Sequence, residues 1–404
     1  MAPRVVWLRW LFAYVMLYCL PFPIAAIRWT DWFEGQYFDL WNSTAQPIGI
    51  HLLGLTESAG VYQHGSGDSI GAYARLLAIV ILATVVTVAW TAIDRRRERH
   101  EQLAQALRVY VRYFLGTTML AYGAHKIFNL QFVGGRASSR MLETYGQSSP
   151  FAIAWTFMGA STAYTVFSGI AEAVGGVLLF FRRSTTMGVL VLLPVVSNVV
   201  LLNFCYDIGV KLESAHLLLM AICLLTPDMQ RLASVALGGA AEAVAPGIVV
   251  ASKRGNIVRV AVKSAFIVAV IAGDILMNVE ILGRLRTRHA LFGAYEVESE
   301  STPKAVHLVM VDELNVFAMR RDDGTLQRFR IDRKSDGDSL TLRPFRNRSA
   351  KYQLSYQRPD DEHLILEGRI DDEPVALHLR KTPMPSFLLK TRGFHWVDDY
   401  PFDP

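Results

Sequence analysis

Long apolar segments separated by short polar ones fill the first 282 residues of the chain. A run of about 20 apolar residues matches the ~30 Å hydrocarbon core of a bilayer. On this pattern we predict an α-helical polytopic membrane bundle with about seven spans. The predicted spans are Val5–Ile27, Ala72–Ile93, Ala106–Phe128, Phe151–Phe181, Met187–Cys205, Leu212–Leu225 and Ile257–Leu282.

Two of these segments have an alternative interpretation. The first has an early arginine and the small residues Ala25 and Ala26, as a signal peptide would. Its apolar stretch is longer than a usual signal-peptide core, which favours an uncleaved helix. The sixth is short, so that a buried or re-entrant helix competes with a full span.

After Leu282 the pattern changes to the period of two that is typical of β-strands. Turn sequences such as Asp322-Asp323-Gly324 separate the segments. The predicted strands are Ala305–Val311, Leu314–Arg320, Thr325–Ile331, Ser339–Arg343, Lys351–Tyr356, Leu364–Ile370 and Val375–Lys381. Short strands with hairpin-sized links predict an antiparallel meander, either a small barrel or a sandwich.

Basic residues gather in three of the predicted loops, and cytoplasmic loops carry an excess of Lys and Arg. These residues are Arg95–Arg97 and Arg99 after the second span, Arg182 and Arg183 after the fourth, and Lys253 and Arg254 before the seventh. All three loops lie on one side if the seven spans are real. We therefore predict a multi-pass protein of a bacterial-type inner membrane, with a cytoplasmic N-terminus and the β-domain outside.

The pattern divides the chain into five parts. We predict two N-terminal spans with an outer loop (1–105), a four-helix membrane core (106–228), a cytoplasmic linker (229–256), the seventh span (257–282) and the external β-domain (283–404).

Composition narrows the function classes. The chain is 52% hydrophobic with a formal net charge of +5, and it has no basic stripe interleaved with aromatics. Membrane lipids are therefore the expected surroundings, and a nucleic-acid partner is not predicted. Cys19, Cys205 and Cys223 form no CxxC pair and no metal-ligand spacing, so no metal site is predicted.

Ionisable side chains in the apolar helices are the main functional candidates, because charge in a hydrocarbon layer is costly. Lys126 ends the third span, with Tyr122 four residues earlier on the same helical face. Such a lysine either snorkels to the headgroups or, when desolvated, acts as a base. Glu172 lies deep in the fourth span, where a carboxyl group is either protonated or paired.

The densest polar cluster joins the fifth and sixth spans, and it contains Asn203, Asp207, Lys211 and His216. A solvated turn and a functional site are both consistent with it. Asp207 and Lys211 are spaced for a surface ion pair of little stability. His216 begins the next apolar helix, where a histidine can titrate near neutral pH.

Several short polar sequences in these helices resemble the DoxX-like family of four-helix bacterial membrane proteins. The matching stretches are Tyr122–Phe128, Gly169–Glu172 with Gly175-Gly176 and Arg182-Arg183, and Asn203–Asp207 with Lys211 and His216–Leu219. The resemblance covers spans three to six. It implies a DoxX-like core associated with quinone-linked or thiol-linked oxidoreductase systems.

Two weaker similarities concern the third span and the β-domain. The stretch Ala124-His125-Lys126-Ile127-Phe128 is distantly similar to the membrane part of vitamin K-dependent carboxylases. That similarity implies that Lys126 is a base that deprotonates a quinol. The strand pattern of the β-domain is similar to that of calycin-like barrels.

These observations predict a quinone-linked oxidoreductase, or a redox-complex component, with a polar site at the outer membrane face and a redox partner protein. The predicted catalytic residues are Lys126, Glu172 and His216, and the predicted quinone-binding residues are Tyr122, Asn203, Asp207 and Lys211. The alternative is a non-enzymatic anchor whose β-domain binds a ligand or a partner protein. A transporter that uses Glu172 and Asp274 as proton relays is a third interpretation, weakened by the lack of visible inverted repeats.

Overall fold

The computed structural model describes residues 3–54, 67–94, 100–240, 252–300, 305–332, 338–345, 350–393 and 395–397. The chain divides into two compact units. A helical unit contains Met1–Phe128 and Val166–Val279, and a β unit contains Asn129–Thr165 and Glu280–Pro404. The predicted membrane core, 106–228, therefore contributes to both units. The basic cluster at 95–99 and the middle of the predicted linker, 241–251, lie outside the described residues.

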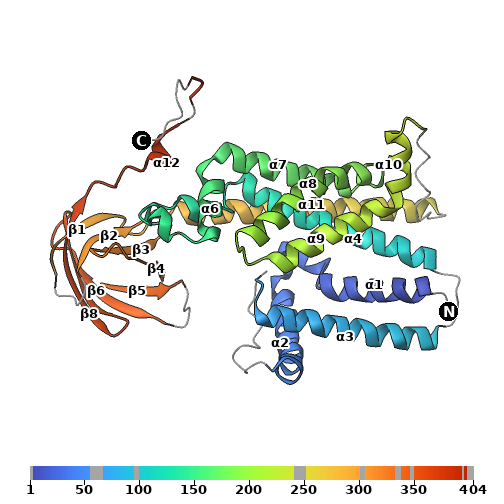
Figure 1. Ribbon diagram of the computed structural model, residues 1–404, viewed down its shortest axis with the longest axis horizontal. Helices are drawn as coiled ribbons and strands as arrows, with labels where there is room; N and C mark the ends of the chain where they lie inside the picture. The colour runs from blue at the N-terminus through green and yellow to red at the C-terminus, as the bar shows by residue number, and fades with distance from the viewer. Residues whose placement is uncertain are drawn as a thin grey trace. The chain divides into compact units, whose positions relative to one another are not determined.

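The helical unit is built from long helices, several of which run in nearly the same direction in Figure 1. They are α1 (Pro3–Cys19), α2 (Asp31–Leu53), α3 (Ile70–Ile93), α4 (His100–Ile127), α7 (Thr162–Leu179), α8 (Thr185–Cys205), α9 (Lys211–Leu225), α10 (Met229–Ala236) and α11 (Lys253–Arg286). Short 3₁₀ turns accompany them at Ile24–Ala26, Arg28–Thr30, Arg182–Ser184 and Thr226–Asp228. The ends of α7 and α11 extend into the β unit.

Among the described residues, five helical segments are long and apolar enough to cross a membrane, as a multi-pass membrane protein requires. They are Ile70–Ile93, Thr162–Leu179, Arg182–Cys205, Lys211–Ala236 and Lys253–Arg286. The count of seven spans stays a prediction. Of the two further segments that we predicted, α1 has 17 residues, and α4 carries charged side chains in its first and last turns.

The helices differ from the predicted spans in two places. First, α2 lies in the segment for which we expected an outer loop. Its Trp41 and Ala45 are buried against Ala78 and Ile79 of α3, so tertiary packing stabilises a helix with a mixed sequence. Second, the predicted fourth span is two helices, α6 (Pro150–Ala160) and α7. Ser161 separates them, and its hydroxyl accepts a hydrogen bond from the Tyr164 N–H in the first turn of α7.

The first helix is an integral part of the helical unit. Val15 and Cys19 are buried in the core that also contains Leu115 of α4. Arg9 is buried as well, and it donates hydrogen bonds to the Asp94 carboxylate at 3.1 Å and to the Asp94 carbonyl at 3.0 Å, at the end of α3. These contacts make α1 part of the packed core of this unit, and the choice between an uncleaved helix and a signal peptide stays a prediction.

Glycines allow α4 and α7 to approach until their backbones touch. A Cβ on Gly123 of α4 would lie 2.6 Å from the carbonyl oxygen of Gly169 in α7. A Cβ on Gly176 of α7 would lie 2.7 Å from the carbonyl oxygen of Gly116 in α4. Residue numbers rise along one helix as they fall along the other, so the two helices are antiparallel. Small residues at a helix crossing are the usual means of close approach in membrane bundles.

The β unit contains a closed antiparallel barrel of eight strands in sequential order, shown in orange and red in Figure 1. The strands are β1 (Gly293–Glu300), β2 (Val306–Val311), β3 (Val316–Arg321), β4 (Leu326–Ile331), β5 (Ser339–Pro344), β6 (Tyr352–Gln357), β7 (His363–Ile370) and β8 (Glu373–Thr382). The predicted antiparallel meander is confirmed. Of the two predicted forms, barrel and sandwich, it is a closed barrel. The sequence analysis missed β1, whose pairing with β8 closes the barrel.

The interior of the barrel is filled with apolar side chains. Alternate residues of each strand, such as Phe317 and Met319 of β3, point into one buried cluster that includes Leu340, Leu354 and Leu377. An eight-stranded barrel is just wide enough for side chains to fill it. This interior is therefore a hydrophobic core.

The segment before α7 packs on the outside of the same barrel. It contains the 3₁₀ turns η3 (Val133–Arg136) and η4 (Tyr145–Gln147), the short helix α5 (Ser138–Met141), and α6. Leu142 is buried with the outward-facing Met310 and Ala318 of β2 and β3. The Ser139 hydroxyl donates a hydrogen bond to the fully buried Asp312 carboxylate. The segment Asn129–Thr165, which lies within the predicted membrane core 106–228, is thus part of the β unit.

The close approach of α4 and α7 at their glycines, called the glycine crossing below, can be tested by substitution. In the variant Gly123→Val, the added side chain would overlap the Gly169 backbone, so we expect the free energy of unfolding to fall by about 1–3 kcal/mol. Thermal unfolding of the detergent-solubilised protein measures the change. Gly35→Ala is the matched control, because a Cβ there meets nothing within 4 Å in α2. Equal melting temperatures for Gly123→Val and the wild type would contradict the crossing.

Candidate functional site

The interior of the helical unit contains an ion pair between Lys126 and Glu172. The Lys126 ammonium donates a hydrogen bond to Glu172 Oε1. Both residues are buried, with 5% of Lys126 and 2% of Glu172 exposed. Lys126 therefore does not extend to the surface of this unit as a snorkelling lysine would. The carboxyl group of Glu172, predicted to be protonated or paired, is paired.

The glycine crossing brings these two side chains together. Gly123 and Gly169 are each three residues before a charged partner on the same helix, which places all four residues along the crossing. Helical side chains lean toward the N-terminus of their own helix. Because α4 and α7 are antiparallel, Lys126 and Glu172 lean toward each other across the glycines. A residue with a Cβ at Gly169 would also collide with Lys126, at 2.7 Å from its Cβ.

The carboxylate of Glu172 is only half satisfied. Its Oε2 atom is buried and has no hydrogen-bond partner among the described residues. A buried acceptor without a partner costs about 1–3 kcal/mol. Such atoms therefore identify positions where a donor from a ligand or water would be stabilising.

A second polar group lies in the same unit, formed by aromatic residues of α1 and α4 with α9. The Tyr122 hydroxyl donates a hydrogen bond to Glu213, and the Tyr14 hydroxyl lies 2.7 Å from Nε2 of His216. The Tyr18 ring stacks on His216, with ring centroids 4.1 Å apart. Nδ1 of His216 lies 2.6 Å from the Leu212 carbonyl. That contact requires a proton on Nδ1, which leaves Nε2 to accept from Tyr14 in the neutral ring.

The turn between α8 and α9 contains the remaining predicted residues. Asp207 is exposed and pairs with Lys211 at 2.8 Å, and the hydrogen bond from Lys211 lowers the pKa of Asp207. Asn203 is buried, and its Nδ2 has no partner among the residues that the structure describes.

The structure reveals two carboxylates that the sequence analysis did not single out. Asp68 caps α9 from a distant segment, since it accepts hydrogen bonds from the Lys211 N–H at 2.7 Å and the Leu212 N–H at 2.9 Å. Such capping satisfies donors that a helix N-terminus leaves free. Glu213 is the partner of Tyr122. Neither pairing is local in sequence. The position of Glu213 in the first turn of an apolar helix is the one sequence signal that could have drawn attention to it.

Six of the seven predicted site residues therefore fall into three places, and the seventh, the buried Asn203, lies near the end of α8. Lys126 and Glu172 form one buried pair, Tyr122 and His216 belong to the aromatic group, and Asp207 and Lys211 form an exposed pair. In α11, the fully buried Asn278 donates to the Asp274 carbonyl, as expected for helix packing. No group of three or more His, Cys, Asp or Glu side chains suited to a metal ion occurs among the described residues.

Comparison with known proteins places the chain in a family without assigning it a reaction. It is 36% identical over 120 residues to the uncharacterized protein YwoB of Bacillus subtilis (strain 168). The match covers 30% of this chain and 75% of that protein. The chain belongs to the YwoB family. No protein-family model and no solved structure matches it.

A double-mutant cycle measures the strength of the ion pair. Lys126→Met or Glu172→Leu alone leaves a buried charge without a partner, so each should lower the free energy of unfolding by about 3–5 kcal/mol. The double variant removes both charges and should recover most of that loss. Thermal unfolding in detergent gives the comparison. Additive losses would mean that the two side chains do not interact.

Proposed function

We propose that the protein binds a quinone in the helical unit and exchanges protons with it through Lys126 and Glu172. The observation that carries this proposal is the buried ion pair with an unpartnered carboxylate oxygen. An ion pair that served only to stabilise the fold would be expected to satisfy both oxygens, because breaking even a part of a buried network is costly. A buried acid and base are also what proton exchange with a lipid-soluble carrier requires.

The residues present fit the polar groups of a quinone. Its ring oxygens accept hydrogen bonds, and the buried amide Nδ2 of Asn203 is a donor without a partner among the described residues. When the oxygens are reduced they carry protons, for which the Glu172 Oε2 is an unpaired acceptor. The Tyr122 hydroxyl and the His216 imidazole, which are hydrogen-bonded to Glu213 and Tyr14, are groups that can orient the quinone ring.

Quinone reduction consumes two electrons and two protons, and quinol oxidation releases them. In this proposal the two protons pass one after the other through the Lys126–Glu172 pair, whose shared hydrogen bond holds one exchangeable proton at a time, and each proton given up is replaced from water. The electrons come from a redox partner protein. Asp207 and Lys211, at the exposed turn, are proposed to lie near the entrance of the site.

The proposal extends to the setting of the protein. We place it in a bacterial-type inner membrane with its N-terminus in the cytoplasm and its β unit outside. The helical unit is proposed to be DoxX-like, which agrees with the resemblance of its polar sequences. Proton exchange at the outer end of the bundle would then couple quinone chemistry to that side of the membrane.

A second candidate function is supported by the β unit. Its filled barrel and the packed outer segment make a rigid body, as expected of a domain that presents a binding surface on a membrane anchor. In that case the Lys126–Glu172 pair would stabilise the anchor without taking part in any turnover.

Lipid extraction distinguishes the two. Mass spectrometry of lipids that co-purify with the wild-type protein should detect quinone near one equivalent, and Lys126→Ala and Glu172→Gln should lose it. Arg108→Gln is the matched control. Arg108 lies in the N-terminal half of α4, whereas Lys126 lies at its C-terminal end, and it forms a 2.6 Å ion pair with Asp228. The control should keep the quinone. Unchanged quinone content in both site variants would contradict the proposal.

A further inference from the structure

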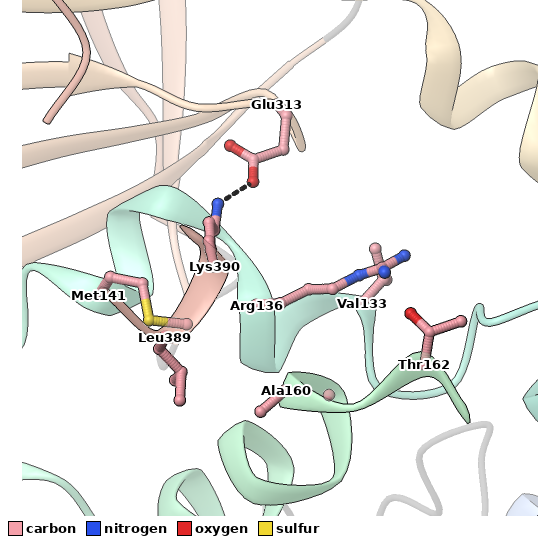
Figure 2. A pocket seen from close by; sticks show the side chains of 9 residues that line it. Val133, Arg136, Met141, Ala160, Thr162, Glu313, Leu389 and Lys390 are labelled. Atoms are coloured by element: carbon pink, nitrogen blue, oxygen red, sulfur yellow. Dashed lines mark hydrogen bonds and ion pairs between the residues drawn. The ribbon is translucent and has the colours of Figure 1, made fainter. Parts of the chain in front are cut away.

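The β unit contains a pocket of about 400 Å³, within the range of small-ligand sites. All of the described residues that line it belong to this unit. They come from the outer segment, the first residue of α7, the β2–β3 turn and the C-terminal helix α12 (Leu388–Thr391), and they are Val133, Arg136, Met141, Gly159, Ala160, Thr162, Glu313, Leu389 and Lys390. Figure 2 shows these side chains around the pocket.

One side of the pocket contains an ion pair between Lys390 and Glu313. Lys390 Nζ donates to Glu313 Oε1 at 2.7 Å and to the Ser138 hydroxyl at 2.8 Å. Burial opposes ionisation of Glu313, but the hydrogen bonds from Lys390 and Ser138 outweigh it and lower its pKa. Lys390 and Glu313 therefore cancel each other's charge, and they also hold α12 to the β2–β3 turn.

Arg136 provides the net charge of the pocket. The described part of the lining contains two cations and one carboxylate, which leaves one positive charge there. Among the described residues, Arg136 has no carboxylate partner. With the Asn129 amide oxygen turned toward it, the guanidinium donates to that oxygen at 2.7 and 3.2 Å. In Figure 2 Arg136 extends toward Thr162, away from the dashed Lys390–Glu313 pair.

Apart from the Thr162 hydroxyl, which is hydrogen-bonded to the Asn129 side chain, the rest of the described lining is apolar. Val133, Met141, Ala160 and Leu389 supply side chains without polar donors, and Met141 lies beside Leu389 of α12 in Figure 2. A pocket with one cation and an apolar wall matches a ligand with one negative charge and a short hydrocarbon chain. A guanidinium presents parallel donors that fit a planar carboxylate.

We propose that this pocket binds the carboxylate of an amphiphile such as a medium-chain fatty acid, with Arg136 as the carboxylate-binding residue. A doubly charged phosphate monoester would leave an unbalanced negative charge beside Glu313. The site lies outside the helical unit and does not depend on the quinone proposal. It gives the β unit a small-molecule ligand in addition to any protein partner.

Photolabelling of the full chain in lipid nanodiscs tests the site. The probe is an octanoate that carries a diazirine, and peptide mass spectrometry reports the labelling of residues 133–141 and 388–391. We expect octanoate to compete for this labelling, and octanol or acetate at the same concentration to compete at least tenfold less. Labelling elsewhere only, or equal competition by octanol, would overturn the proposal.

Variants separate carboxylate recognition from folding. Arg136→Gln should lower the labelling about tenfold, the loss expected for one charge-assisted hydrogen bond. Arg140→Gln is the matched control, because Arg140 pairs with Glu143 and does not line the pocket. Leu389→Ala should weaken competition by octanoate without altering the Arg136 contact. Wild-type labelling and competition in Arg136→Gln would also overturn the proposal.

Discussion

The contact between two glycine-lined helices is the constraint on which the proposed site depends. With a Cβ at Gly123 or Gly169, α4 and α7 would move apart and Lys126 would lose its reach to Glu172. Taking two charges out of water costs several kcal/mol for each ion, and only close pairing offsets this. A buried pair adds little stability over an apolar pair of similar shape. Its presence at this close crossing therefore favours a functional role over a stabilising one.

The two units satisfy the hydrogen bonds of their backbone N–H and C=O groups in different ways. The helices satisfy their own backbone groups, and distant residues such as Asp68 satisfy the free N–H groups at the start of α9. The barrel closes through β1 and β8, so that no strand edge is left unpaired. Its core is filled, and its ligand-sized space lies outside the barrel, where the outer segment and α12 meet the β2–β3 turn.

The hydrophobic pattern predicted the helices and most of the strands, because each element buries an apolar face at its own period. It failed where long-range packing decides the structure. The mixed sequence of α2 is helical because α1 and α3 cover it, and β1 forms only when β8 closes the barrel. Lys126 and Glu172 were recognisable as costly charges, but their pairing depends on the register of α4 and α7. The pocket around Arg136 had no sequence signal, since its residues come from three distant segments.

Infrared difference spectroscopy during electrochemical reduction of bound quinone tests the central claim, that Glu172 exchanges a proton with it. The membrane-reconstituted protein is compared with Glu172→Asp, which keeps a carboxyl group, and with Glu172→Gln, which does not. Our account predicts a carboxyl stretching signal on reduction in the wild type, shifted in Glu172→Asp and absent in Glu172→Gln. A signal that is identical in all three proteins would contradict it.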